Sequence, residues 1–291
     1  MLCGEYAVLN GASAFALPTK AGQSLHVEIG AASDSPILTW KAINKNGEVW
    51  FQAKIALPYF IVLEYTDQDV SIQLLRFLIN AKALNQNFLS EGKDVQVTTN
   101  LEFDNDEGLG SSSTLTNNIA QWAQVNPFSL HFNAFKGSGF DVAVAQEGKP
   151  VLYTMNGSEP KVETLEWNKP FRDKLYFVHL NKKQNSRLQI ANYKRNMSPT
   201  QVAQITRISK LISINDDYFE FCLLLELAEN EMSQVLGMPC IKQELFEDFK
   251  GTVKSLGAWG GDYVLATGED TVTYFQSKGY HRIIPFNDLI L

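Results

Sequence analysis

Glycines and hydroxyl side chains are concentrated in residues 108–114, which read Gly-Leu-Gly-Ser-Ser-Ser-Thr, and a segment with helical character follows from Leu115 to Val125. The first turn of a helix exposes unpaired backbone N–H groups and carries partial positive charge, and glycine lets that backbone approach a ligand closely. The stretch therefore predicts a phosphate site, to which hydroxyls could add hydrogen bonds or one Mg2+ ligand. It is neither a Walker A loop nor a dinucleotide fingerprint. Taken alone, it could equally be a serine-rich turn before an ordinary helix.

A second glycine-rich turn, Gly137 to Ala143, carries one carboxylate, Asp141, beside small residues. A carboxylate in such a place could accept a proton from a substrate hydroxyl or help to hold Mg2+. The alternative is a turn aspartate that bonds its own backbone.

Two further glycine-containing segments, residues 257–262 and 4–11, are candidates for a binding role. Gly257 to Asp262 reads Gly-Ala-Trp-Gly-Gly-Asp and could close over phosphates through its backbone N–H groups. Its alternative is a helix C-cap at Gly257 that leads into a strand. Gly4 to Gly11 joins a polar turn to an apolar run and indicates little by itself.

The elements that must position these segments change in kind along the chain. The first half has short alternating or β-branched runs between turns, with Asn46-Gly47 predicting a hairpin and one helix expected at about Asp69 to Leu84. The second half alternates strands with longer helices, and we expect two domains, residues 1–165 and 166–291. The expected strands are Gln23–Gly30, Ile37–Ala42, Glu48–Ala56, Asp94–Phe103, Val151–Tyr153, Val162–Leu165, Leu175–Leu180, Tyr263–Ala266 and His281–Ile284.

Four helices are expected in the second half, the last a short one between the strands Tyr263–Ala266 and His281–Ile284. Ser198-Pro199-Thr200-Gln201 combines an N-cap serine, a proline at the first helical position and a capping-box glutamine, which predicts a helix to about Ile214. A second is expected from about Asp217 to Leu236, ended by Gly237, and a third from about Lys242 to Leu256.

Composition narrows the class of protein. The chain has 291 residues, of which 45% are hydrophobic and 20% charged, as is typical of a globular protein with a large core. Its net charge of −7, with no basic cluster beyond Lys182-Lys183, argues against a nucleic-acid partner. We expect no membrane span and no signal peptide. Three cysteines without metal-ligand spacing fit a reducing compartment, so a cytoplasmic location is expected.

In this order along the chain, the four segments resemble the motifs of the GHMP kinases, the family of galactokinase, homoserine kinase, mevalonate kinase and phosphomevalonate kinase. Residues 2–9 are similar to the first motif, 108–113 to the phosphate-binding Gly-Leu-Gly-Ser-Ser-Ala motif, 139–143 to the segment with the catalytic aspartate, and 257–262 to the third motif. The similarity is greatest to the phosphomevalonate kinase branch and to a small bacterial subgroup marked by Gly-Tyr-Asp-Ile-Ala.

The resemblance implies an α+β fold of two lobes, with an N-terminal lobe like the second domain of ribosomal protein S5 and a ferredoxin-like C-terminal lobe. It implies a kinase that transfers the γ-phosphoryl group of ATP, with Mg2+, to a phosphomevalonate- or mevalonate-like small molecule. Asp141 would be catalytic and Ser112 would bind Mg2+. The implied nucleotide-binding residues are Gly108, Leu109, Gly110, Ser111, Ser112 and Ser113. The implied substrate-binding residues are Gly4, Glu5, Ser138, Gly139, Lys183, Ser186, Arg187, Gly257, Ala258, Trp259 and Gly260.

The sequence departs from the family pattern in four places. The lysine that usually opens the first motif would fall before Met1, and Leu130 stands where mevalonate kinase has a Mg2+-binding glutamate. Trp259 replaces a small glycine, and its ring could fill the acceptor pocket or stack on a ligand. The spacing from Gly110 to Asp141 is short, which indicates that a helix is missing. Two alternatives therefore stay open: a GHMP kinase for another alcohol or a sugar, and a non-catalytic ligand-binding relative.

Overall fold

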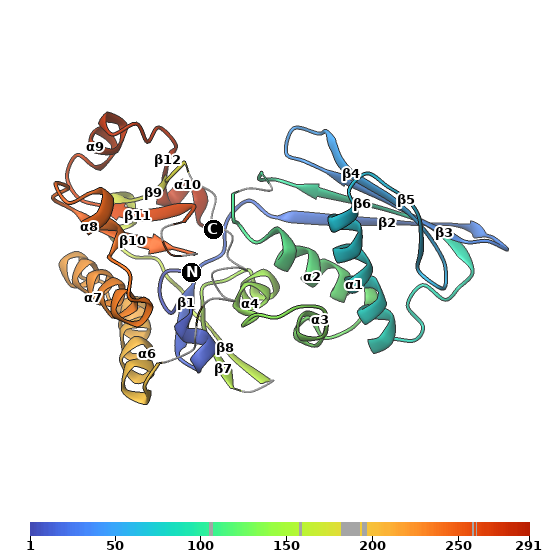
Figure 1. Ribbon diagram of the computed structural model, residues 1–291, viewed down its shortest axis with the longest axis horizontal. Coiled ribbons are helices and arrows are strands. Elements are labelled where there is room, and N and C mark those ends of the chain that lie inside the picture. The colour runs from blue at the N-terminus through green and yellow to red at the C-terminus, as the bar shows by residue number, and fades with distance from the viewer. Residues whose placement is uncertain (105–106, 157–158, 182–192, 194–196, 258, 260) are drawn as a thin grey trace. The chain divides into compact units, whose positions relative to one another are not determined.

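The computed structural model describes residues 1–104, 107–156, 159–181, 193, 197–257, 259 and 261–291. The chain forms two compact units: the terminal unit, residues 1–20 with 147–291, and the central unit, residues 21–146. The expected α+β class is confirmed (Figure 1). The division differs from the boundary expected at residue 165 because β1 (Ser13–Ala16) pairs antiparallel with β7 (Val151–Asn156). The N-terminal segment therefore belongs with the C-terminal part of the chain.

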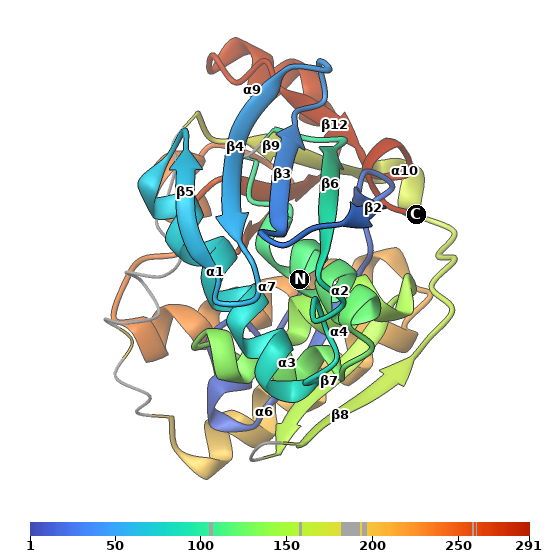
Figure 2. The same cartoon turned by 90° about the vertical axis from the view of Figure 1, so that its right-hand side faces the viewer.

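The central unit is a five-stranded sheet with helices on one face. The strand order is β2-β6-β3-β4-β5, which Figure 2 displays edge to edge, and only β3 and β6 pair in parallel. Alternation along the strands buries one side of the sheet, as at Leu38, Trp40 and Ala42, against the helices. The strands are β2 (Gln23–Ala32), β3 (Ile37–Ile43), β4 (Val49–Ala56), β5 (Ile61–Tyr65) and β6 (Lys93–Leu101), and the helices are α1 (Gln68–Leu84), α2 (Ser111–Ala123), α3 (Pro127–Ala134) and α4 (Phe140–Glu147).

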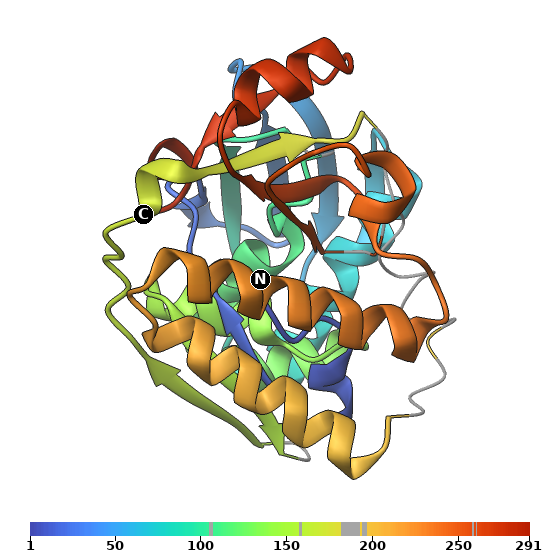
Figure 3. The same ribbon diagram turned by 90° about the vertical axis from the view of Figure 1, so that its left-hand side faces the viewer.

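The terminal unit contains two antiparallel sheets, in the orders β1-β7-β8 and β10-β11-β9-β12. Two long helices, α6 (Pro199–Ile214) and α7 (Tyr218–Leu236), run side by side (Figure 3), with α6 against β1 and α7 against β10. The other strands are β8 (Glu159–Thr164), β9 (Leu175–His179), β10 (Thr252–Leu256), β11 (Tyr263–Thr267) and β12 (Ile283–Pro285). The shorter helical elements are η1 (Ala7–Asn10), η2 (Arg172–Lys174), α8 (Ile241–Leu245), α9 (Thr271–Ser277) and α10 (Phe286–Leu289).

Helix ends with strong local signals form as expected. At the start of α6, the Ser198 side chain accepts from the Gln201 N–H, and the Gln201 side chain accepts from the Ser198 N–H. Gly237 ends α7 in the left-handed region, with φ 63°. Both ends are set by contacts within a few residues, which is why the sequence predicts them well.

The helix expected from about Lys242 to Leu256 is wrong. α8 ends at Leu245, and residues from Thr252 form strand β10, paired with β11. Gly251 lies between them, packed so closely that an added Cβ would collide with the carbonyl oxygen of Thr267. Because β10 precedes Gly257, the helix C-cap alternative for that glycine is also wrong. Strands β1 and β5 and helix α3 were not expected.

Among the described residues, no helix has both the length and the apolar character needed to cross a bilayer.

Candidate functional site

In the central unit, the predicted phosphate segment leads into α2. The N-cap residue is Gly110, in the left-handed region with φ 86°, and Gly108 has φ 66°. Glycine has no side chain with which to cap a helix, so the start of α2 presents backbone N–H groups rather than a capping oxygen. Ser111 and Ser112 are half-buried beside this end, and Ser113 is buried. The structure thus places residues 108–113 at a helix N-terminus suited to an anion.

Polar contacts hold α2 against the sheet. The Thr114 hydroxyl donates to Gln23 Oε1 at 2.9 Å, and Asn118 Nδ2 donates to the backbone oxygen of Gln23 at 2.7 Å. Both contacts reach β2 from the first two turns of the helix. The helix start is therefore supported by a rigid element, which is how a ligand site keeps its geometry.

A lysine that the sequence analysis passed over lies next to the phosphate segment. Lys45, in the turn between β3 and β4, forms ion pairs with Asp104 Oδ2 at 2.6 Å and Glu107 Oε1 at 3.6 Å. These two acids lie just before Gly108. The hairpin signal at Asn46-Gly47 predicted the turn, but only the fold brings the Lys45 cation to this place.

The candidate catalytic carboxylate lies in the first turn of α4. Gly139, with φ 78°, precedes this helix, and Ser138 and Gly139 are buried. Asp141 is exposed, whereas the next two residues are buried. Asn117 Nδ2 on α2 donates to the backbone oxygen of Ala145 on α4 at 3.2 Å. The helix that carries Asp141 therefore contacts the helix that begins with the phosphate segment.

His131 lies beside the turn that leads to Asp141. An added Cβ at Gly137 would lie 3.6 Å from His131 Nε2, and this nitrogen is buried without a hydrogen-bond partner among the described residues. Burial lowers the pKa of His131, so the ring is neutral at physiological pH. Nothing in the sequence pattern distinguished this histidine from the other three.

Leu130, which stands where mevalonate kinase has a Mg2+-binding glutamate, has no side-chain atom that could bind a metal ion. Leu130 is fully buried in the core of the central unit, on α3. Within the described part of the chain, no cluster of three or more His, Cys, Asp or Glu side chains could hold a metal ion.

In the terminal unit, the N-terminal turn is fixed by close backbone packing. Gly4 has φ 97°, and an added Cβ would lie 2.6 Å from the Cα of Ala14 on β1. Tyr6 also has a positive φ, 53°, which is uncommon for a residue with a side chain. The turn can therefore form only with glycine at position 4, and it directs Glu5 and Tyr6 into the unit.

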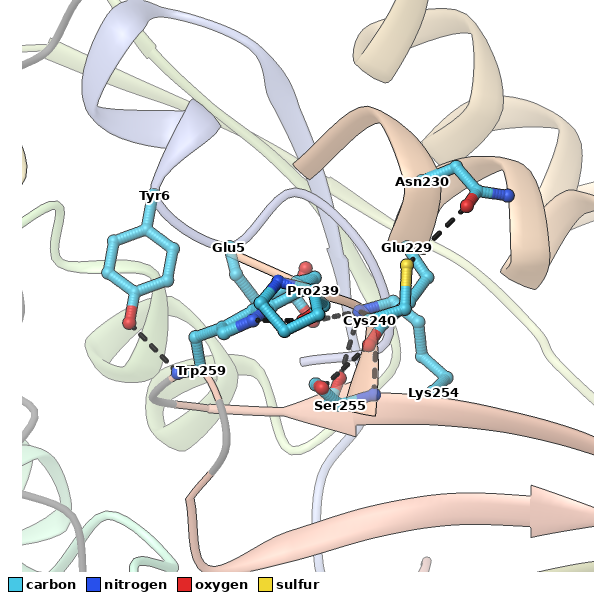
Figure 4. Close-up of polar contacts among 9 residues, drawn as sticks. All are labelled: Glu5, Tyr6, Glu229, Asn230, Pro239, Cys240, Lys254, Ser255 and Trp259. Carbon is cyan, nitrogen blue, oxygen red and sulfur yellow. Dashed lines mark hydrogen bonds and ion pairs between the residues drawn. The ribbon is translucent and has the colours of Figure 1, made fainter. Parts of the chain in front are cut away.

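Glu5 points into a buried charge cluster (Figure 4). Its Oε1 lies 2.9 Å from Nζ of Lys254, whose side chain is fully buried, and Glu229 Oε2 lies 3.2 Å from the same nitrogen. Glu229 also accepts from the backbone N–H and the hydroxyl of Ser255. Burial alone would lower the pKa of Lys254, but Glu5 and Glu229 outweigh it and raise the pKa. Lys254 is therefore charged. No sequence motif marked this lysine, because its partners lie far away in the chain.

The Trp259 side chain is anchored inside the terminal unit. Its ring is 3% exposed and packs with Tyr6, Ile205 and Met232. Its Nε1 donates to the backbone oxygen of Pro239 at 3.1 Å, and its backbone N–H donates to the Tyr6 hydroxyl at 3.0 Å (Figure 4). These contacts give the ring a role in holding the segment after Gly257.

Five of the predicted site residues lie outside the described residues, namely Lys183, Ser186, Arg187, Ala258 and Gly260.

No protein-family model matches the sequence, and no curated protein matches it either. Solved structures do. A Lin0012 protein from Listeria innocua is 17% identical with a TM-score of 0.71, over 98% of this chain and 94% of that one. Streptococcus pneumoniae phosphomevalonate kinase, in complex with phosphomevalonate and AMPPNP, is 14% identical with a TM-score of 0.62, over 96% and 92% of the two chains. L. major mevalonate kinase, in complex with R-mevalonate, is 14% identical with a TM-score of 0.61, over 95% and 89%.

A galactokinase and a heptose 1-phosphate kinase are also similar in structure. The fold is thus the one that the GHMP kinases share, and the resemblance indicated by the sequence motifs is confirmed at the level of fold.

Proposed function

We propose that this protein is an ATP-dependent kinase that phosphorylates a small molecule similar to phosphomevalonate or mevalonate. The observation that carries the proposal is the start of α2, where Gly108 and Gly110 leave backbone N–H groups at a helix N-terminus. The similar fold includes a structure with AMPPNP and phosphomevalonate bound, which supports a nucleotide and a small acceptor as substrates. Three free cysteines fit the reducing cytoplasm as the place of action.

Each group has one task in the proposed reaction. The N–H groups of residues 108–113 bind the nucleotide phosphates, and the Ser112 hydroxyl would be a ligand of Mg2+. When bound, Mg2+ would neutralise charge on the transferring phosphoryl group. The acceptor oxygen forms a bond to the γ-phosphorus, the bond from that phosphorus to the β–γ bridging oxygen breaks, and ADP leaves. Asp141 takes the proton of an acceptor hydroxyl. If the acceptor oxygen belongs to a phosphate, no proton needs to be removed, and Asp141 positions charge instead.

An acceptor panel tests this proposal. ADP formation is measured with Mg-ATP and, separately, phosphomevalonate, mevalonate, homoserine, galactose and a heptose phosphate. We expect turnover with phosphomevalonate or mevalonate above the rate with water alone. Turnover with a sugar only would replace the acceptor but keep the kinase, and the galactokinase and heptose 1-phosphate kinase of similar fold make this a real alternative.

The buried Leu130 and the absence of an acidic cluster within the described residues favour a second candidate, a ligand-binding protein without phosphoryl transfer. Calorimetry separates the two. Binding of Mg-AMPPNP by the full chain supports the kinase, whereas no binding of the nucleotide and no turnover with any acceptor would exclude the kinase and favour the second candidate.

A further inference from the structure

Two consecutive residues of the N-terminal turn bond to residues that precede and follow Gly257 in the sequence. Glu5 pairs with Lys254, three residues before this glycine, and the Tyr6 hydroxyl accepts from the N–H of Trp259, two residues after it (Figure 4). We call these two contacts the clamp. They join residues 249 and 253 positions apart in the chain, and both lie within the terminal unit.

We propose that Tyr6 and Lys254 are positioning residues: through the clamp, they hold Gly4 and Glu5 of the N-terminal turn, together with Gly257 and Trp259, in the arrangement that binds substrate. This inference rests on the proposed kinase function and on the substrate-binding role that the resemblance implies for those four residues. It adds a role for residues that reach the substrate only through their neighbours.

The charge balance of the cluster favours positioning over stability as the reason for its presence. The cluster sets two acidic side chains, Glu5 and Glu229, against one cation in a buried place, and Glu5 Oε2 has no hydrogen-bond partner among the described residues. Burying charges costs several kcal/mol per ion, and well-packed apolar residues often do as well or better. What an ion cluster adds is direction, because Glu5 Oε1 and Glu229 Oε2 must each meet the Lys254 ammonium in one geometry.

Backbone strain at Tyr6 points the same way. A side-chain-bearing residue with φ 53° is held there only when its surroundings determine it. In this conformation the Tyr6 ring packs against Tyr193, with centroids 5.4 Å apart, and the Tyr6 hydroxyl accepts from the Trp259 N–H. The unusual backbone conformation therefore goes together with the hydrogen bond to Trp259.

Tyr6→Phe tests the clamp because it removes one oxygen and keeps the ring. Tyr193→Phe is the matched control, since that hydroxyl lies in the same aromatic cluster but bonds Asn10 Oδ1, at 2.6 Å. The first readout is amide hydrogen exchange of peptides that cover residues 253–263. We expect exchange to be about three- to tenfold faster in Tyr6→Phe and unchanged in Tyr193→Phe, as the loss of one hydrogen bond implies.

The second readout is steady-state kinetics with the acceptor identified by the panel. We expect kcat/KM to fall by about tenfold in Tyr6→Phe, with most of the change in KM for the acceptor. The melting temperature should fall by a similar amount in Tyr6→Phe and Tyr193→Phe, because each variant loses one hydrogen bond. A purely structural hydroxyl would lower the melting temperature and leave KM alone.

The two readouts separate the failures. If the wild-type protein turns over no acceptor, the proposed function fails, and amide exchange still decides whether the clamp exists. Unchanged exchange in Tyr6→Phe, or faster exchange with wild-type KM and kcat, would overturn the positioning role.

Discussion

The start of α2 and the turn at Gly4 are both glycine-containing motifs, yet glycine serves them in opposite ways. Around Gly110 an added Cβ would meet no atom within 4 Å, and the residue is needed for its positive φ alone. At Gly4 the same Cβ would collide with Ala14. The start of α2 has no side-chain cap on its backbone N–H groups, whereas the turn at Gly4 packs backbone against backbone. Glycine is therefore needed for its positive φ in one place and for close packing in the other.

The two regions also differ in how they treat charge. Asp141 on α4 is exposed, whereas Glu5 and Lys254 are buried as partners of each other. An exposed carboxylate can exchange protons with a ligand, but a buried ion pair is committed to its geometry. We call the start of α2 together with Asp141 the open region, and the turn at Cys3–Tyr6 together with Glu229 and Lys254 the closed region. We expect substitutions in the open region to change chemistry, and substitutions in the closed region to change stability and positioning.

Asp141→Ala should have the largest effect and should spare stability. If Asp141 takes the proton of an acceptor hydroxyl, kcat should fall by about 10²- to 10⁴-fold, with Mg-ATP affinity unchanged. The measurement is ADP release together with nucleotide titration. Glu147→Ala, at the other end of the same helix, is the control. Wild-type turnover in Asp141→Ala would remove the proposed base.

Lys254→Met should act mainly on stability, because it leaves two buried carboxylates without their shared cation. We expect a loss of about 3–5 kcal/mol in the free energy of unfolding, measured by urea denaturation. Lys278→Met is the control: Lys278 also pairs with an acid, Asp248 at 2.8 Å, but is 40% exposed, so its loss should cost at most about 1 kcal/mol. Equal losses in the two variants would contradict the distinction between buried and exposed ion pairs.

Gly110→Ala should weaken nucleotide binding through the backbone. Alanine is strained at φ 86°, so the helix start shifts at a cost of about 1–2 kcal/mol, or about a tenfold rise in Kd for Mg-AMPPNP. Gly92→Ala meets equally open space at φ 65° in the same unit, which makes it a control for strain alone. The interpretation of Gly110 as part of a phosphate site would not survive an equal Kd in both variants.

The Cys3 thiol tests whether the closed region stays closed, and this test needs no substitution. Burial, with a contribution from Glu5, raises the pKa of this thiol from 9.0 to about 12. In the folded state the thiol keeps its proton above pH 9, whereas the unfolded chain loses it, so stability should fall slightly as the pH rises above 9. At pH 8 we expect no alkylation of Cys3 before unfolding, as mass spectrometry of labelled peptides would detect. Labelling of Cys3 in the native protein would mean that the closed region opens.

The sequence predicted local structure best where short-range contacts decide it. The capping box at Ser198 and the stop at Gly237 set their helix ends within a few residues, and both formed as expected. It failed between Lys242 and Leu256, where one continuous helix was expected. There, residues from Thr252 form a strand because they pair with β11, and the carbonyl oxygen of Thr267 leaves no room for a side chain at position 251. Long-range pairing is invisible to a periodicity argument.

The sequence by itself determined the four motifs, their order and the fold family they indicate, because glycine, hydroxyl and carboxylate positions carry that information locally. Only the tertiary structure decided that the first motif folds with the last part of the chain, and that Glu5 and Tyr6 meet Lys254 and Trp259. Those partners are separated by about 250 residues. A buried ion pair or a single hydrogen bond leaves no periodic trace in either segment, so the backbone must first bring the two segments together.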